Sequence, residues 1–171
     1  MCSILGIIDF DKKKQDKELE IKKINDLLKH RGPDDEGFYN DEYVSLAFNR
    51  LSILDLQKGN QPIKNNHIIS IFNGEIYNFK EVRKELEDSG FNFKTNSDSE
   101  IIPAAFLKWG IECISKFNGM FAISIYDLNE KKLYLIRDRV GIKPLYYSLF
   151  NGLLVFSSEI SGIINHSDFK R

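Results

Sequence analysis

The residue that could most clearly take part in a chemical reaction is Cys2. The initiator methionine is removed efficiently when a small side chain follows it, so we expect a mature chain that begins with a thiol and a free α-amine on one residue. An α-amine has an ordinary pKa of about 7.7–8.0 and a lysine about 10.4, so the α-amine is the better general base near neutral pH. Such an amine can activate a terminal Cys, Ser or Thr as a nucleophile. On position alone, however, a small buried residue in the first strand is the favoured interpretation of Cys2.

A second candidate is the pair Asn73-Gly74, which follows an apolar run at 67–72. A side-chain amide and an adjacent backbone N–H together suit the oxyanion of an acyl-transfer intermediate. Glycine also lets a ligand approach the backbone closely. The alternative is an ordinary hairpin turn, like those suggested at Asn118-Gly119 and Asn151-Gly152, and without other evidence the turn is favoured.

Several other chemistries are excluded by the residues present. The three histidines, His30, His67 and His166, lie far apart in the sequence, so no zinc-type spacing exists and we expect no metal site. The sequence holds neither a P-loop nor a dinucleotide-binding glycine motif, so we expect no nucleotide cofactor in this chain. It also lacks a Gly-x-Ser-x-Gly elbow.

Length and composition indicate one globular domain. The chain has 171 residues, of which 42% are hydrophobic and 29% charged. Its 24 Lys+Arg and 25 Asp+Glu give a formal net charge of −1, which argues against a nucleic-acid partner. No apolar run is long enough to cross a bilayer, and the first residues lack the basic region of a signal peptide. Two cysteines make no disulfide framework, so we expect a reducing, cytoplasmic location.

Periodicity predicts the elements that would position these residues. Strands are expected at 2–10, 43–50, 67–73, 119–127, 132–137, 144–150 and 153–158, and helices at 17–29, 79–89 and 97–110. Ser97 and Glu100 have the spacing of a capping box at the start of the third helix. Because strands outnumber helices and several are joined by hairpins, the pattern favours a mainly antiparallel α+β domain.

At this point the chain resembles a known family, the class II glutamine amidotransferases, which are N-terminal nucleophile hydrolases. Within that family it is most similar to the glutaminase domain of the asparagine synthetase branch. Nine segments carry the resemblance, in the family's order and over nearly the whole chain: CSILG at 2–6, RGPD at 31–34, NRLSILD at 49–55, GNQP at 59–62, NGEIYN at 73–78, SDSE at 97–100, NGMFA at 118–122, RDRVGIKPLYY at 137–147 and FSSE at 156–159.

The resemblance implies a fold and a catalytic group. The fold would be a four-layer αββα sandwich of two mostly antiparallel sheets, with residues 1–171 as a single glutaminase domain. Cys2 would attack the side-chain amide of L-glutamine, with its own α-amine as the base. Asn73 and the N–H of Gly74 would form the oxyanion hole.

The resemblance also implies a set of substrate residues. Arg50 would bind the substrate α-carboxylate, Asp98 the α-ammonium, and Glu75 and Ile53 would help to bind the substrate. Arg31 and Gly32 would belong to a loop that closes over the bound glutamine.

Two further expectations concern residues without a catalytic role. Arg137, Asp138 and Arg139 are expected to form a structural ion-pair network, and Cys113 to lie in the core. Ser3 departs from the glycine that many family members have at this place. A small serine is expected to fit there.

The partners implied are L-glutamine and an ATP-dependent synthetase domain, in cis or in trans. The pyrophosphate loop Ser-Gly-Gly-x-Asp-Ser of that second domain does not occur here, so ATP and Mg²⁺ are expected only there. Homodimerisation is left open. So are other ammonia acceptors, as in glucosamine-6-phosphate synthase, amidophosphoribosyltransferase and enzymes that amidate sugars or peptides, and a non-catalytic domain that only binds glutamine.

Overall fold

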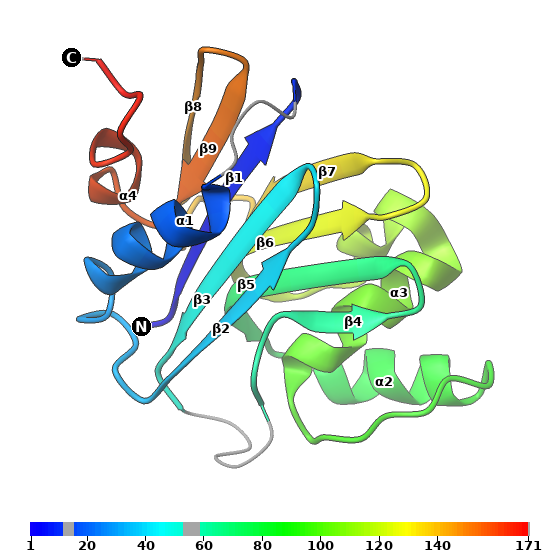
Figure 1. Ribbon diagram of the computed structural model, residues 1–171. Coiled ribbons are helices and arrows are strands. Elements are labelled where there is room, and N and C mark those ends of the chain that lie inside the picture. The colour runs from blue at the N-terminus through cyan, green and yellow to red at the C-terminus, as the bar shows by residue number, and fades with distance from the viewer. Residues whose placement is uncertain (12–15, 53–58, 171) are drawn as a thin grey trace.

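Two β-sheets pack face to face, and helices cover the outer side of each (Figure 1). The computed structural model describes residues 1–11, 16–52 and 59–170. The first sheet has the strand order β2-β3-β1-β9-β8 and the second the order β4-β5-β6-β7. All pairs of neighbouring strands in both sheets are antiparallel. The predicted αββα sandwich is therefore confirmed.

The first sheet is built around the N-terminal strand. β1 (Ser3–Asp9) lies between β3 (Val44–Arg50) and β9 (Leu153–Ser157). β2 (Asp35–Asn40) and β8 (Tyr146–Phe150) form the two edges. A terminal segment is ordered only when something ties it down, and here strands on both sides do so.

The second sheet has its longest strands in the middle. β5 (Ile68–Ile76) pairs with β6 (Gly119–Asp127) over its full length. β7 (Lys132–Arg137) forms one edge. At the other edge β4 (Ile63–Asn65) pairs with 68–70, and no strand among the described residues lies beside the second half of β5 on that side.

The helices form the two outer layers. α1 (Lys17–Asp26) and α4 (Ser161–Ile164) lie on the first sheet. α2 (Phe79–Glu87) and α3 (Ile101–Trp109) cover the second. Two 3₁₀ helices, Asp98–Glu100 and Gly110–Lys116, precede and follow α3.

Alternation along β1 shows how the sequence builds two cores at once. Ile4 and Ile8 point between the sheets, where they pack with Phe48, whereas Leu5 and Ile7 point to α1. A strand that is buried on both faces must be apolar throughout, which explains the continuous run at the N-terminus. A third cluster, which includes Cys113, fills the space between the second sheet and its helices, as predicted for that residue.

Of two local predictions about turns and caps, one was wrong and the other is confirmed only in part. Asn73-Gly74 is no turn, because both residues lie inside β5, and Gly119 begins β6; only Asn151-Gly152, with positive φ at both residues, joins a hairpin. The capping box forms only in part. Ser97 Oγ accepts from the Ser99 N–H, but the Glu100 carboxylate accepts from the backbone N–H groups of Lys94 and Thr95 instead.

The sequence patterns did not reveal β2 or β4. β2 reads DEGFYN, and Asp and Gly are depleted in strands, so its own residues do not favour extended structure. It forms because β3 offers a complete row of backbone partners from Arg50 to Ser45. β4 is only three residues long.

The expected ion-pair network at 137–139 was also wrong. Within the described residues, Asp138 accepts from the backbone N–H groups of Phe121, Val140, Ile142 and Lys143, and the Arg137 guanidinium donates to the carbonyls of Gly141 and Lys143. Burial by itself raises the pKa of the Asp138 carboxyl, but these backbone donors outweigh it and lower the pKa. The motif thus organises a loop rather than an ion pair.

We predict that Asp138→Ala lowers the free energy of unfolding by about 3 kcal/mol, because several buried N–H groups lose a charged acceptor. Asp26→Ala is the control, since its ion pair with Lys29 is exposed and worth under about 1 kcal/mol. Urea denaturation at pH 7 measures both. Because the folded pKa of Asp138 is lowered, its contribution is present above pH ~4 and is lost as the pH falls further. Equal midpoints for the two variants would contradict this role.

Candidate active site

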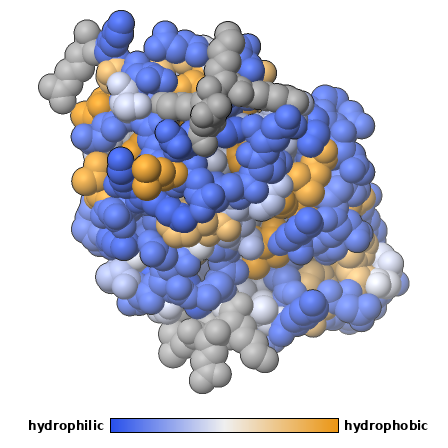
Figure 2. Space-filling model, viewed as in Figure 1, coloured by the Kyte–Doolittle hydropathy of each residue, from blue (hydrophilic) through white to orange (hydrophobic). Residues whose placement is uncertain are grey.

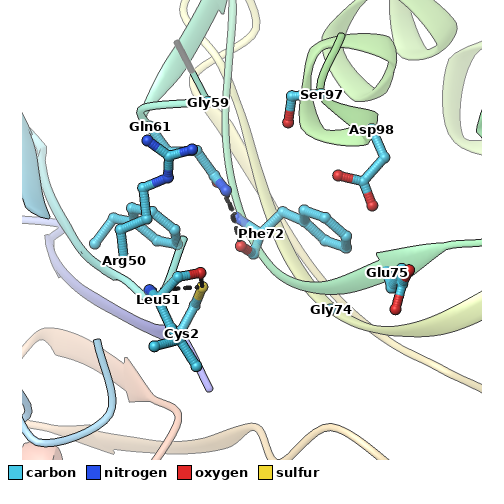
Figure 3. Close-up of a pocket in the computed structure, with 11 residues that line it drawn as sticks. Cys2, Arg50, Leu51, Gly59, Gln61, Phe72, Gly74, Glu75, Ser97 and Asp98 are labelled. Carbon is cyan, nitrogen blue, oxygen red and sulfur yellow. Dashed lines mark hydrogen bonds between the residues drawn. The ribbon is translucent and has the colours of Figure 1, made fainter. Parts of the chain in front are cut away.

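A cavity opens where β3 and β5, one from each sheet, end side by side (Figure 3). It brings together five of the residues named from the sequence: Cys2, Arg50, Gly74, Glu75 and Asp98. The other residues that line it are Phe48, Leu51, Gly59, Gln61, Phe72 and Ser97. Ile53 lies outside the described residues.

Cys2 stands directly before β1 and is half-buried at the cavity wall. Its Sγ lies 3.3 Å from the backbone nitrogen of Leu51, which donates to it, and 3.6 Å from the Leu51 carbonyl oxygen. Both groups belong to the residue that follows β3. The backbone of the neighbouring strand therefore fixes the direction in which the thiol points.

A charged pair holds the main chain of Cys2 from behind. Arg31 donates from Nε to the Cys2 carbonyl at 3.1 Å and from Nη1 to Glu159 at 3.1 Å. Burial raises the pKa of Glu159, but Arg31 and then His30 outweigh it and lower the pKa, which keeps this carboxylate ionised. A Cβ on Gly32 would lie 2.5 Å from backbone atoms of Asn49, so the 31–32 segment packs tightly against β3.

A buried amide network holds the next residue. Asn49 Nδ2 donates to Ser3 Oγ at 3.1 Å and to Asn25 Oδ1 at 2.9 Å, and Asn25 donates back to Asn49 Oδ1 at 2.8 Å. All three side chains are buried. The serine at position 3 thus fits, and its hydroxyl connects the start of β1 to β3 and α1.

The open edge of β5 faces the cavity, and its pairing register determines what it offers. Phe121 exchanges hydrogen bonds with Asp138, on the β7 side, so its partner Gly74 cannot bond to it. In an antiparallel pair the residues alternate in direction, so the backbone groups of Phe72, Gly74 and Ile76 all point to the open edge. Gln61 binds those of Phe72, and Asp98 accepts from the Ile76 N–H at 3.0 Å. The N–H of Gly74 is left between them.

Gly74 must be a glycine for reasons of space. A Cβ there would lie 2.1 Å from the Met120 carbonyl oxygen and 2.7 Å from the Phe121 Cα. The close approach of β6 therefore excludes every other side chain at this position.

Asn73 lies one residue earlier in β5 and does not line the cavity. It pairs with Ala122, and its side chain is on the inter-sheet face with Ile71, only 2% exposed. Its Nδ2 is buried and has no hydrogen-bond partner in the described part of the chain. A buried amide donor without a partner is costly, and a catalytic role is one of the reasons for which such a group is kept.

Positive and negative groups occupy different walls of the cavity. Arg50 ends β3, is only 5% exposed, and donates from Nη1 to Asn60 Oδ1 at 2.8 Å. Glu75 in β5 and Asp98 at the start of the 3₁₀ helix lie on the other wall (Figure 3). Burial, and to a lesser extent Glu75, raises the pKa of Asp98 to about 6, although backbone donors such as the Ile76 N–H oppose the shift. Two carboxylates so close together favour a bound cation.

Sequence reasoning missed several residues that the site depends on. Glu159 and Leu51 lay inside segments that resembled the family but suggested no chemistry, as did Asn60 and Gln61. Their contribution is to hold other groups in place, which residue type and spacing alone do not reveal.

Among the described residues, no group of three or more His, Cys, Asp or Glu side chains could hold a metal ion. None of the helices in that part of the chain is long and apolar enough to span a membrane.

Comparison with known proteins decides the family. The sequence model of one protein family, described as the glutamine amidotransferase domain, matches residues 1–171. The chain belongs to this family. As a glutamine amidotransferase domain, it is 44% identical over 163 residues to asparagine synthetase [glutamine-hydrolyzing] 1 of Bacillus subtilis, which covers 93% of this chain and 26% of the relative. It is 39% identical over 169 residues to asparagine synthetase B [glutamine-hydrolyzing] of Escherichia coli, covering 96% of this chain and 30% of the relative.

A solved structure agrees on the fold. Glutamine phosphoribosylpyrophosphate amidotransferase from B. subtilis, complexed with ADP and GMP, superposes with a TM-score of 0.74 over 95% of this amidotransferase domain and 43% of that chain. At 19% identity this likeness concerns the fold alone. The domain spans 26–30% of the length of the two curated relatives.

Proposed function

We propose that this domain hydrolyses L-glutamine to L-glutamate and ammonia through a thioester on Cys2. One observation carries the proposal: the Cys2 thiol opens onto a cavity with a buried arginine on one wall, two carboxylates on another, and Gly74 on β5, whose N–H points away from β6. These groups match a zwitterionic amino acid whose side chain carries an acyl group. The names of the relatives, which specify glutamine hydrolysis, support the same substrate.

The charged groups would bind the substrate by its α-carbon. The guanidinium of Arg50, oriented by Asn60, would bind the α-carboxylate, and a two-pronged contact of this kind is strong and directional. Asp98 would accept from the α-ammonium, with Glu75 adding negative charge beside it. Held at this end, the side chain of glutamine would extend toward Cys2.

The chemistry follows in two halves. The thiolate of Cys2 adds to the amide carbon, and the C=O electrons move to oxygen, where Gly74 N–H and Asn73 Nδ2 would stabilise the charge. Collapse expels the amide nitrogen, which takes a proton and leaves as ammonia, so the acyl group stays on sulfur. Water then adds to the thioester and releases glutamate and the thiol. Asn73 has to turn its amide toward Cys2 for this role.

The base would be the α-amine of Cys2 itself. It takes the thiol proton and returns it to the leaving nitrogen, the shuttle expected of a group that titrates near neutral pH. In the sequence Met1 precedes Cys2, and in that form the nitrogen is a peptide amide without a basic lone pair. Removal of Met1 is therefore part of the proposal.

Arg31 and Gly32 were assigned to a loop that closes over the substrate, and that role stays a prediction. Their contacts suggest an additional one, because Arg31 fixes the carbonyl of the nucleophile residue. Substrate contact by Ile53 also stays a prediction.

The ammonia would serve an ATP-dependent synthetase domain, and the relatives' names, which call them asparagine synthetases, support this. ATP and Mg²⁺ would act there and not in this cavity. A cytoplasmic setting would keep Cys2 and Cys113 as free thiols, the state in which both occur. Homodimerisation also stays a prediction.

The first prediction about the proposed reaction concerns the N-terminus. A chain that retains Met1 is expected to release ammonia at least ~10²-fold more slowly than the processed chain, because general-base assistance is worth ~10²–10⁴-fold. Cys2→Ser keeps the amine but offers a weakly acidic alcohol, so it should bind glutamine without turnover. The intact mass of each preparation shows whether Met1 is present, and steady-state ammonia release measures the activity. Full activity with Met1 in place would refute the mechanism.

A second prediction separates binding from chemistry. Arg50→Ala should raise KM for glutamine sharply, because the α-carboxylate loses its partner in ground state and transition state alike. Asn73→Ala should instead lower kcat by ~10²-fold or more, the usual effect of losing one oxyanion donor, with KM changed little. Steady-state kinetics at pH 7.5 distinguish the two. If Arg50→Ala and Asn73→Ala both raised KM and left kcat unchanged, the assigned roles would be contradicted.

The third prediction uses the raised pKa of Asp98. Below about pH 6 this carboxyl takes up a proton and loses the charge that attracts the ammonium group, so KM should rise as the pH falls from 7.5 to 5. The substrate's own positive charge opposes that protonation, so kcat should change less. Asp98→Asn should have a high KM that no longer depends on pH in this range. A flat KM for the unsubstituted domain would overturn the assignment.

A further inference from the structure

The segment at 59–62 belongs to the site but has no chemical role in the proposed reaction. Asn60 and Gln61 stand side by side in it, and their side chains point to two different parts of the machinery. Asn60 contacts Arg50 on β3. Gln61 contacts the backbone of Phe72 on β5, as Figure 3 shows. The segment therefore touches both sheets at the mouth of the sandwich.

The side chain of Gln61 takes the place of a missing strand. Its Oε1 accepts from the Phe72 N–H at 2.6 Å, and its Nε2 donates to the Phe72 carbonyl at 3.0 Å. These are the two bonds that a neighbouring strand would make with this residue. Gln61 is 8% exposed, so the pairing is sheltered from competing water.

The main chain of Gln61 is fixed from the opposite side. A Cβ on Gly37 in β2 would lie 1.8 Å from the Gln61 carbonyl oxygen, so the two backbones are in close contact. Gln61 thus spans from the first sheet to the edge of the second. Its main chain is held against β2, and its carboxamide is held by the two hydrogen bonds to Phe72.

The position of Gln61 matters because of what comes two residues later. Phe72 and Gly74 present their backbone groups to the same edge of β5, so whatever fixes the first sets the direction of the second. A real strand in this place would continue past Phe72 and pair with the Gly74 N–H. A single carboxamide satisfies Phe72 and ends there, so in the described part of the chain no strand covers the Gly74 N–H.

We propose that Gln61 is a positioning residue for the oxyanion hole, and that its neighbour Asn60 positions Arg50 for substrate binding. This inference rests on the proposed glutamine hydrolysis. Adjacent residues would then control separate kinetic quantities: Gln61 controls kcat through the Gly74 N–H, and Asn60 controls KM through the guanidinium. Both are proposed to act through another group, Gly74 or Arg50, so we class them as positioning residues and not as catalytic ones.

The chain offers a matched control for Gln61. Asn78 also bridges two backbone groups with its carboxamide, donating to the Lys116 carbonyl at 2.9 Å and accepting from the Asn118 N–H at 2.9 Å. It stands before α2 and does not line the cavity. Gln61→Met and Asn78→Leu each remove such a bridge while nearly preserving side-chain size.

The experiment measures ammonia release from processed chains, with thermal unfolding recorded for each. Gln61→Met should lower kcat 10- to 100-fold with KM within threefold of the unsubstituted domain. Asn60→Ala should raise KM about tenfold with kcat within threefold. Asn78→Leu should leave kcat and KM unchanged even where it lowers the unfolding temperature as much as Gln61→Met does.

A direct readout of the oxyanion hole completes the test. The aldehyde analogue of glutamine adds the Cys2 thiol to form a tetrahedral hemithioacetal, whereas glutamate only fills the ground-state site. Gln61→Met should lower the affinity for the aldehyde by the same factor by which it lowers kcat, and it should leave the affinity for glutamate unchanged. Unaltered kcat for Gln61→Met, an effect on KM alone, or an equal loss of kcat in Asn78→Leu would overturn the inference. If the unsubstituted processed domain releases no ammonia, the proposed function fails and this inference fails with it.

Discussion

The site depends on one feature of the second sheet, the unpaired edge of β5 beyond β4. A sheet edge normally invites another strand, and proteins usually cover or disrupt it. Here the edge is covered piecewise, by the Gln61 carboxamide at Phe72 and by the Asp98 carboxylate at Ile76. Between these two caps, the Gly74 N–H points to the same edge, and no strand covers it in the described part of the chain. The same edge that would favour aggregation in a longer strand therefore supplies the polar wall of the cavity.

The start of the chain meets a second constraint, because a residue before the first strand has to be held as firmly as one in the core. β1 lies between two strands, but Cys2 precedes their register with β1. Its carbonyl is held by Arg31, its thiol lies against Leu51, and Ser3 is bound by Asn49. These contacts come from two segments, the one at 31–32 and the end of β3. Such a convergence of buried polar groups fixes a thiol more precisely than packing alone, because hydrogen bonds are directional.

Much of the fold could be predicted from the sequence, because its long strands and helices have strong periodicity. The two-sided apolar run of β1 and the Asn151-Gly152 turn are local signals that the structure confirms. β2 and β4 could not be predicted, since their own residues do not favour strands and they form only beside β3 and β5. For the site, residue type indicated Cys2, and resemblance indicated Arg50 and Asp98. Nothing local showed that Asp138 binds backbone groups instead of arginines, because those partners depend on how the loop folds.

The buried charges explain why such a site is compatible with a stable fold. Arg50 and Asp98 are each 5% exposed, and burying a charge without partners is costly. Asp98 is relieved in part by the Ile76 N–H, and Arg50 by Asn60. The cavity thus has opposite charges on two walls, together with the amide of Asn73, whose nitrogen has no hydrogen-bond partner among the described residues. A zwitterion with a terminal amide carries the complement of all three, so the groups that cost stability in the empty domain are the ones that the proposed substrate would satisfy.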